Sequence, residues 1–261
     1  MRFSIIVVSL NAGDELLGTI NSILEQTYQD YEIVIKDGGS SDGSLTKLPA
    51  SDKIRLVTRE DKSIYDAMNQ AILEAQGDYY IFLNCGDYFY DKTVLARTAK
   101  EIIGSQADIL YGNLVRRDVE GLIASSPQIT DFTCYRNIPC HQVCFYKKSM
   151  FEARGYDLSY PVRADYEHFL YCKYELGASF HYMDFVVALY EGAGFSETKA
   201  SEKKAAIEHR IITNKYLGAK CYWYRFIMLV TFQPLRKRIA AGRFSVIYQK
   251  IKEVIYGRKK A

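Results

Sequence analysis

Residues 31–40 read Tyr31-Glu32-Ile33-Val34-Ile35-Lys36-Asp37-Gly38-Gly39-Ser40, so that a short apolar run ends in a polar turn. The run at 31–36 is rich in β-branched residues and is typical of a strand. Asp37 and the two glycines after it favour a turn, because these residue types adopt the backbone angles that turns require. An almost wholly apolar run at residues 3–9 precedes this segment and predicts a central, buried parallel strand.

On either side of these two runs, strands alternate with helices through the first half of the chain. We expect further strands at residues 54–58, 79–83 and 108–112, and helices over 16–27, 64–75 and 92–104. Ser63 and Asp66 have the spacing of a capping box, and Gly77 is expected to stop the second helix. This βαβαβαβ order predicts an α/β fold with a mainly parallel central sheet and helices on both faces.

The second half of the chain is less regular. We expect a strand at 143–146, a helix at 165–176, a strand or strand pair at 180–190 and a helix at 196–217. A basic amphipathic segment follows Gln233-Pro234. The hydrophobic content of 48% and the charged content of 25% are ordinary for a globular protein and exclude a disordered or low-complexity chain.

Polar side chains follow four successive predicted strands, at the point where each strand ends. They are Ser9 and Asn11, then Asp37, then Glu60 and Asp61, and finally Asn84 and Asp87. Because the carboxyl ends of parallel strands share one edge of a sheet, we expect these side chains to converge on one cleft. A cleft lined by carboxylates binds phosphate only through a divalent cation, and oxygen ligands suit Mg²⁺ or Mn²⁺. With no GxGxxG or P-loop sequence present, this combination indicates nucleotide-sugar chemistry.

Charge is distributed unevenly along the chain. The net charge is +3 overall, but residues 215–261 carry 12 Lys/Arg and one acid, whereas residues 1–214 are net acidic. Aromatic residues at 222–226 precede most of these basic residues, which fits an interfacial helix on an anionic membrane surface. A solvated helical face packed on the domain is the alternative. We expect no nucleic-acid partner, because no recognition motif accompanies the charge.

The six cysteines include no CxxC pair. Cys134, Cys140, His141 and Cys144 allow a zinc hypothesis, but their spacing matches no usual finger, and reduced, mostly buried thiols are the favoured interpretation. The N-terminal apolar run lacks the features of a signal peptide, and the longest apolar run near the C-terminus is too short to span a bilayer. We therefore expect a cytoplasmic protein.

Four motifs resemble, in order, those of the family 2 glycosyltransferases. They are IVVSLN at 6–11, EIVIKDGGSSDG at 32–43, DKSIYDAMNQ at 61–70 and LNCGD at 83–87, and the resemblance covers about residues 3–198. It implies a GT-A fold and an inverting transfer from a nucleotide-diphospho-sugar. Together with the change of charge at residue 215, it predicts a GT-A domain at 1–214, with a nucleotide-binding half at about 1–112 and an acceptor half at about 113–214, and a basic amphipathic helical extension at 215–261.

The resemblance also assigns roles to individual residues. The residues expected to bind the nucleotide sugar are Ser9, Asn11, Asp37, Gly39, Asp61, Asn69 and Asn84. Asp87 matches the last acid of the metal-binding motif, and Asn84 stands where many members have an acid. Asp165 matches the general base, with Ala164 in place of a first acid, and Glu167 is the fallback. His141 is expected on the acceptor side.

Each of these residues also has a structural explanation. Asp37 and Asp87 are good turn residues, Asp66 is explained by capping, and Asp165 is favoured at any helix N-terminus. Asn69 fits a solvated helix position, and His141 fits a buried structural histidine. These alternatives stay open at the level of sequence.

We thus expect an inverting glycosyltransferase that uses a UDP-, GDP- or dTDP-sugar, together with Mn²⁺ or Mg²⁺. The resemblance implies a glycan acceptor linked to lipid, in bacterial surface polysaccharide synthesis, on the cytoplasmic face of the membrane. Two alternatives are a sugar nucleotidyltransferase, which would need a basic Gly-rich loop that is not seen, and an inactive membrane-associated scaffold of the same fold.

Overall fold

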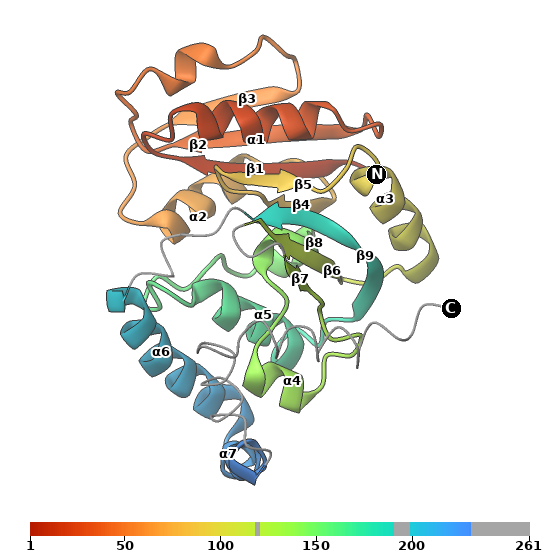
Figure 1. Ribbon diagram of the computed structural model, residues 1–261, viewed down its shortest axis with the longest axis vertical. Coiled ribbons are helices and arrows are strands. Elements are labelled where there is room, and N and C mark those ends of the chain that lie inside the picture. The colour runs from red at the N-terminus through yellow and green to blue at the C-terminus, as the bar shows by residue number, and fades with distance from the viewer. Residues whose placement is uncertain (118–120, 191–198, 231–261) are drawn as a thin grey trace. The chain divides into compact units, whose positions relative to one another are not determined.

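The computed structural model describes residues 1–117, 121–190 and 199–230 (Figure 1). The chain divides into two compact units, Met1–Ile212 and Thr213–Ala261. In the first unit the described strands are β1 (Phe3–Ser9), β2 (Tyr31–Asp37), β3 (Ile54–Thr58), β4 (Tyr79–Phe82), β5 (Asp87–Phe89), β6 (Ile109–Arg116), β7 (Gly121–Ile123), β8 (Cys144–Lys147) and β9 (Phe180–Tyr190). The described α-helices of both units are α1 (Asp14–Leu24), α2 (Ile64–Glu74), α3 (Val94–Ser105), α4 (Asp131–Arg136), α5 (Ala164–Tyr174), α6 (Lys199–Leu217) and α7 (Lys220–Val230).

The nine described strands form one sheet in the order β3-β2-β1-β4-β8-β6-β9-β5, with β7 paired to β6. The first four strands are mutually parallel, as the sequence predicts. Strand β8 lies between β4 and β6 and is antiparallel to both. Strand β6 therefore runs in the same direction as β4, although the two strands are not paired with each other. The sheet is therefore mixed, although six strands share one direction.

Strands β1 and β2 lie inside the sheet, and their burial reflects this position. Every residue of β1 and β2 is buried, and the aliphatic side chains of both strands have no more than 8% of their surface exposed. Helix α2 packs against β1 and β2, α1 against β5, and α3 against β9. Strands that are covered on both faces have a continuous apolar sequence, and the apolar run at 3–9 predicts a buried strand for this reason.

Helix α2 differs in detail from its expected form. The Ser63 hydroxyl accepts a hydrogen bond from the Asp66 amide at 3.2 Å, but the Asp66 carboxylate accepts from the Lys62 amide at 2.8 Å and not from Ser63. The helix ends at Glu74, before Gly77. Gly77 serves close packing instead, because a Cβ there would lie 2.7 Å from the backbone nitrogen of Ser4.

The second half also differs modestly from expectation. Strand β6 extends to Arg116, and residues 180–190 form one long strand whose pairing with β6 is interrupted by two register shifts. The far end of β9 pairs with β5, which places Tyr190 opposite Asp87. Helix α6 begins at Lys199, and residues 191–198 lie outside the described residues.

Candidate active site

The ends of β1, β2 and β3 lie together, as predicted, and a buried lysine ties them. Ser9 pairs in register with Asp37, and Asp37 with Thr58. The fully buried Lys36 ammonium donates to the Asp61 carboxylate at 2.8 Å, to the Asp37 carbonyl at 3.0 Å and to the carbonyl of Arg59. Asp61 is thus held by a cation that the sequence analysis left without a role.

Asp37 forms the turn that follows β2. Its carboxylate accepts hydrogen bonds from the backbone amides of Gly39 and Ser40, both at 2.8 Å, and from the Ser40 hydroxyl. Gly39 has a φ of +101°, a conformation that favours glycine. The structural explanation for Asp37 is therefore correct, and its contact with a nucleotide stays a prediction.

Asn11 ties the loop after β1 to the loop after β2. Its side-chain oxygen accepts a hydrogen bond from the Ser41 backbone N–H at 2.9 Å, and its backbone N–H donates to the Ser40 hydroxyl at 2.8 Å. Asn11 has a positive φ of 49°, which asparagine tolerates better than most residues. Together with Ser9, these contacts give a rigid pair of loops beside the strand ends.

A cavity of about 540 Å³ is lined by Asn84, Asp87, His141 and Asp165, which come from three segments of the chain. The other residues predicted to bind the nucleotide sugar do not line it: Ser9, Asn11, Asp37, Gly39, Asp61 and Asn69. Cys85, which lies between Asn84 and Asp87 in sequence, donates from its thiol to the Val8 carbonyl at 3.3 Å and so links this cavity to the end of β1. We refer to this space as the site cavity.

Within the site cavity a chain of contacts connects Asp165 to Asn84 through His141. The His141 Nδ1 lies 3.4 Å from Asp165 Oδ2, and its Nε2 lies 3.2 Å from the Asn84 amide nitrogen. Because an amide nitrogen only donates, Nε2 accepts, and the proton of the neutral ring lies on Nδ1, facing the carboxylate. His141 therefore contacts the predicted base directly.

Asp165 has a second partner in Tyr65. It lies in the first turn of α5, its side chain is 22% exposed, and its Oδ1 is 2.9 Å from the Tyr65 hydroxyl. Burial alone would raise the pKa of Asp165, but the contacts of its carboxylate with His141 and with the hydroxyl of Tyr65 bring it below its ordinary value. The carboxylate is ionised at neutral pH and able to accept a proton.

Glu167, the fallback base, is engaged elsewhere. Its side chain is fully buried, and its two carboxylate oxygens contact the Arg154 guanidinium at 3.0 and 2.9 Å. Glu167 also does not line the site cavity, whereas Asp165 does, so an acceptor bound there would meet Asp165 and not Glu167. The structure therefore favours Asp165 over Glu167.

Asp87 lies at the start of β5 and is only 3% exposed. Burial raises the pKa of its carboxyl to about 7, while His141 and Gln142 act in the opposite direction. Among the described residues, the Asn84 side-chain oxygen is buried without a hydrogen-bond partner, and no group of three or more His, Cys, Asp or Glu side chains is placed to hold a metal. These two oxygen donors fit a hard cation that takes its other ligands from a diphosphate.

Asn69 lies apart from the site cavity. Its amide nitrogen donates to the Tyr156 carbonyl at 2.9 Å, and its oxygen accepts from the Tyr156 amide at 2.7 Å. This reciprocal pair fastens α2 to the chain ahead of α5. The structure thus gives Asn69 a structural role, and its contact with the nucleotide sugar stays a prediction.

The site cavity is also lined by residues to which the sequence assigns no role, among them Tyr65, Glu15 and Gln142. Tyr65 lies inside one of the four family motifs, and its place in that motif is the sequence feature that could have indicated a role in the site. Glu15 in the first turn of α1 raises the pKa of Asp87, and Gln142 directly follows His141. Nothing in the residue type alone marks either of them.

Comparison with known proteins identifies the family. The model of "Glycosyl transferase family 2" matches residues 4–157. The chain belongs to this family. A "PGL/p-HBAD biosynthesis glycosyltransferase" from Mycobacterium bovis (strain BCG / Pasteur 1173P2) is 35% identical over 205 residues, covering 75% of this chain and 79% of the relative.

Solved structures confirm the GT-A fold for this family 2 member. S. aureus TarS 1-349 superposes with a TM-score of 0.62 at 19% identity, over 73% of this chain and 60% of TarS 1-349. Its complex with UDP-GlcNAc gives 0.63 at 17% identity, over 83% and 72%. The mannosyltransferase PcManGT from Pyrobaculum calidifontis, in complex with GDP-Man and Mn²⁺, gives 0.60 at 17% identity, over 99% and 81%.

Proposed function

We propose that this glycosyltransferase moves a sugar, with inversion, from a nucleotide-diphospho-sugar to a hydroxyl of its acceptor. The observation that carries the proposal is the ionised Asp165 carboxylate in the site cavity, held by His141 and Tyr65 and sharing that cavity with Asp87 and Asn84. Related structures bind UDP, UDP-GlcNAc or GDP-Man, which supports a donor of this class.

The chemistry follows from these positions. Asp165 takes the proton of the acceptor hydroxyl as that oxygen attacks the anomeric carbon, opposite the departing nucleoside diphosphate. A new glycosidic bond forms while the bond to the diphosphate breaks, so one displacement inverts the centre. Asp87 and Asn84 would hold Mn²⁺ or Mg²⁺, which offsets the charge that grows on the leaving group. Ser9, Asn11, Asp37, Gly39 and Asp61 would form the nucleotide side, with His141 facing the acceptor.

The acceptor we propose is a lipid-linked glycan of a bacterial surface polysaccharide, reached from the cytoplasmic face of the membrane. Helix α7 supports a peripheral attachment, because Tyr222, Trp223 and Phe226 are 80%, 71% and 58% exposed along it. Most of the basic residues that would contact anionic lipid lie at 236–260, outside the described residues. No described helix combines the length and the apolar character that a membrane crossing needs. The division into a GT-A domain at 1–214 and an extension at 215–261 belongs to this proposal.

Replacing Asp165 by Asn tests the proposal. We expect nucleotide binding, measured as a thermal shift with UDP, GDP or dTDP and Mn²⁺, to stay as in the wild type, and transfer to fall by at least about 10²-fold. Asp52→Asn, an exposed acid outside the site cavity, is the matched control. Unchanged transfer in the Asp165 variant would refute the assignment of the base, and absence of any nucleotide effect in the wild type would favour the inactive scaffold.

A further inference from the structure

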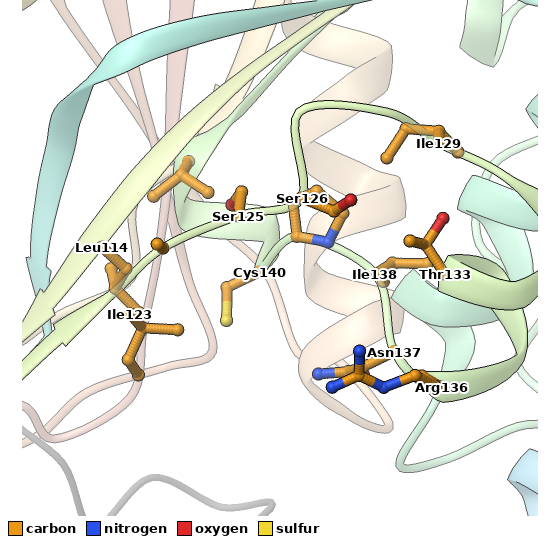
Figure 2. Close-up of a pocket in the computed structure, with 13 residues that line it drawn as sticks. Leu114, Ile123, Ser125, Ser126, Ile129, Thr133, Arg136, Asn137, Ile138 and Cys140 are labelled. Carbon is orange, nitrogen blue, oxygen red and sulfur yellow. The ribbon is translucent and has the colours of Figure 1, made fainter. Parts of the chain in front are cut away.

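A second cavity, of about 370 Å³, opens beside the site cavity (Figure 2). All of its lining comes from one stretch of chain, residues 114–143, which includes the end of β6, strand β7 and helix α4. This volume lies at the lower end of the range of small-molecule sites. We call it the side cavity.

The side cavity borders the site cavity. Six residues line both of them: Leu114, Ile123, Asn137, Ile138, Pro139 and Cys140. The last of these immediately precedes His141, whose ring contacts Asp165. A molecule that presents a hydroxyl to Asp165 therefore has the side cavity within reach of its remaining atoms.

Seven of the thirteen residues that line the side cavity are aliphatic or proline. Leu114 and Ile123 stand on one side, Ile129 and Ile138 on another, and Figure 2 shows these side chains around an open space, with Arg136 and Asn137 together at one end. Apolar walls of this kind favour an occupant that loses little hydration when it enters.

The hydroxyl groups of the lining are already occupied by the protein itself. Ser125 donates to the Gly112 carbonyl at 2.6 Å, Ser126 to the Gln128 carbonyl at 2.9 Å, and Thr133 to the Thr130 carbonyl at 2.8 Å. A sugar ring placed among the aliphatic side chains would lose hydrogen bonds to water, which is costly for hydroxyl groups, and the polar side chains of Arg136 and Asn137 lie only at one end. The chemistry of the walls therefore suits a hydrocarbon or aromatic group better than a second sugar.

We propose that the side cavity binds an apolar group, aryl or alkyl, that the acceptor carries next to the hydroxyl to be glycosylated. This inference rests on the proposed function, because it takes Asp165 as the base that faces the acceptor. It adds to that function a requirement on the acceptor: a free sugar binds weakly, and the same sugar attached to an apolar group binds well.

Binding of two small probes to the full chain tests this proposal. Phenyl β-D-glucopyranoside and methyl β-D-glucopyranoside share one sugar and differ in the apolar group, and their binding is measured by saturation-transfer NMR and by titration. We expect the phenyl compound to bind at least about tenfold more tightly, with saturation strongest on its ring protons, because filling an apolar pocket gives discrimination of this order.

A matched pair of variants locates the binding. Ile129 lines only the side cavity, whereas Ile103 on α3 is 73% exposed and lines neither cavity. We expect Ile129→Asp to abolish the preference for the phenyl compound and Ile103→Asp to preserve it. Equal binding of both probes by the wild type, or equal effects of the two substitutions, would overturn the proposal. A normal thermal shift with nucleotide in the same samples would show that the proposed function survives such a result.

Discussion

Tyr65 is the residue whose replacement most directly tests how the base works. Its hydroxyl lies 2.9 Å from Asp165 Oδ1 and 3.0 Å from the Val162 carbonyl. The hydroxyl has one proton, so it donates to the carboxylate while Asp165 is ionised. Once Asp165 has taken a proton, the Tyr65 hydroxyl can accept from it and donate to Val162 instead. Tyr65 thus has a partner in both protonation states of the base.

The two arrangements differ in strength. A hydrogen bond to a charged acceptor contributes about 1.5–3 kcal/mol, and one between neutral groups about 0.5–1.5 kcal/mol. Tyr65 therefore favours the ionised form of Asp165 by about 1 kcal/mol, which corresponds to about a fivefold change in equilibrium. Tyr65→Phe removes this preference, so the pKa of Asp165 should rise from its lowered position.

The assay is a pH profile of kcat/KM, followed through release of the nucleoside diphosphate. We expect the acidic limb to move to higher pH in Tyr65→Phe, with activity on that limb about fivefold lower, and a smaller loss on the alkaline plateau. Tyr156→Phe is the control, because its ring centroid lies 5.4 Å from that of Tyr65 and its buried hydroxyl has no hydrogen-bond partner among the described residues.

Two results would refute this reasoning. A loss of equal size at every pH would show that Tyr65 only supports the structure, since the titration of Asp165 would then be unaffected. An acidic limb that moves equally in Tyr65→Phe and Tyr156→Phe would assign the shift to general repacking around α5.

Three further predictions concern Asp87 and Lys36. Because the pKa of Asp87 is raised to about 7, Mn²⁺ titrated at pH 8 should bind about tenfold more tightly than at pH 6, and Asp87→Asn should remove this dependence. The same raised pKa means that the free energy of unfolding of the wild type falls as pH rises from about 4 to 7. Asp87→Asn should therefore be more stable than the wild type at pH 8, by at most about 4 kcal/mol in urea unfolding. A variant less stable than the wild type would contradict this. Lys36→Met should cost about 3 kcal/mol in the same measurement, since it leaves buried acceptors unpaired, whereas Lys47→Met breaks an exposed pair, 48% and 88% exposed, and should cost less than about 1 kcal/mol. Similar losses in the two lysine variants would show that the buried cation does not tie the strand ends.

The sequence predicts best those parts of the fold that depend on local burial. Strands β1, β2 and β4 have continuous apolar sequences because helices or other strands cover both faces, and their parallel order follows from the helices between them. The position of β8 could not be predicted, because its pairing of Tyr146 with Tyr80 joins residues far apart in the chain and leaves no local pattern.

The candidate site shows the same division. The motifs place Asp37, Asp61 and Asn84 at strand ends by geometry alone, and the structure finds them there. The partners of these residues come from distant segments: Tyr65 and Asp165 are 100 residues apart, and Asn69 and Tyr156 are 87 apart. Residue type determines which hydrogen bonds a side chain can form, but only the tertiary fold determines its partners. The sequence therefore predicts a substrate contact for Asn69 and does not reveal that its side chain is hydrogen-bonded to the backbone of Tyr156.

The thiols of this protein have a practical consequence for experiments. All six cysteines are unpaired, and burial raises the pKa of each, to about 12 for Cys85 and about 11 for Cys140, the two that are partly exposed. At neutral pH only about one in ten thousand Cys140 groups is a thiolate, the form that reacts with alkylating reagents. A single cysteine introduced on the surface should therefore react far faster than the native ones. Fluorophores or spin labels could then be attached at chosen positions, beside either cavity, without first removing the natural thiols.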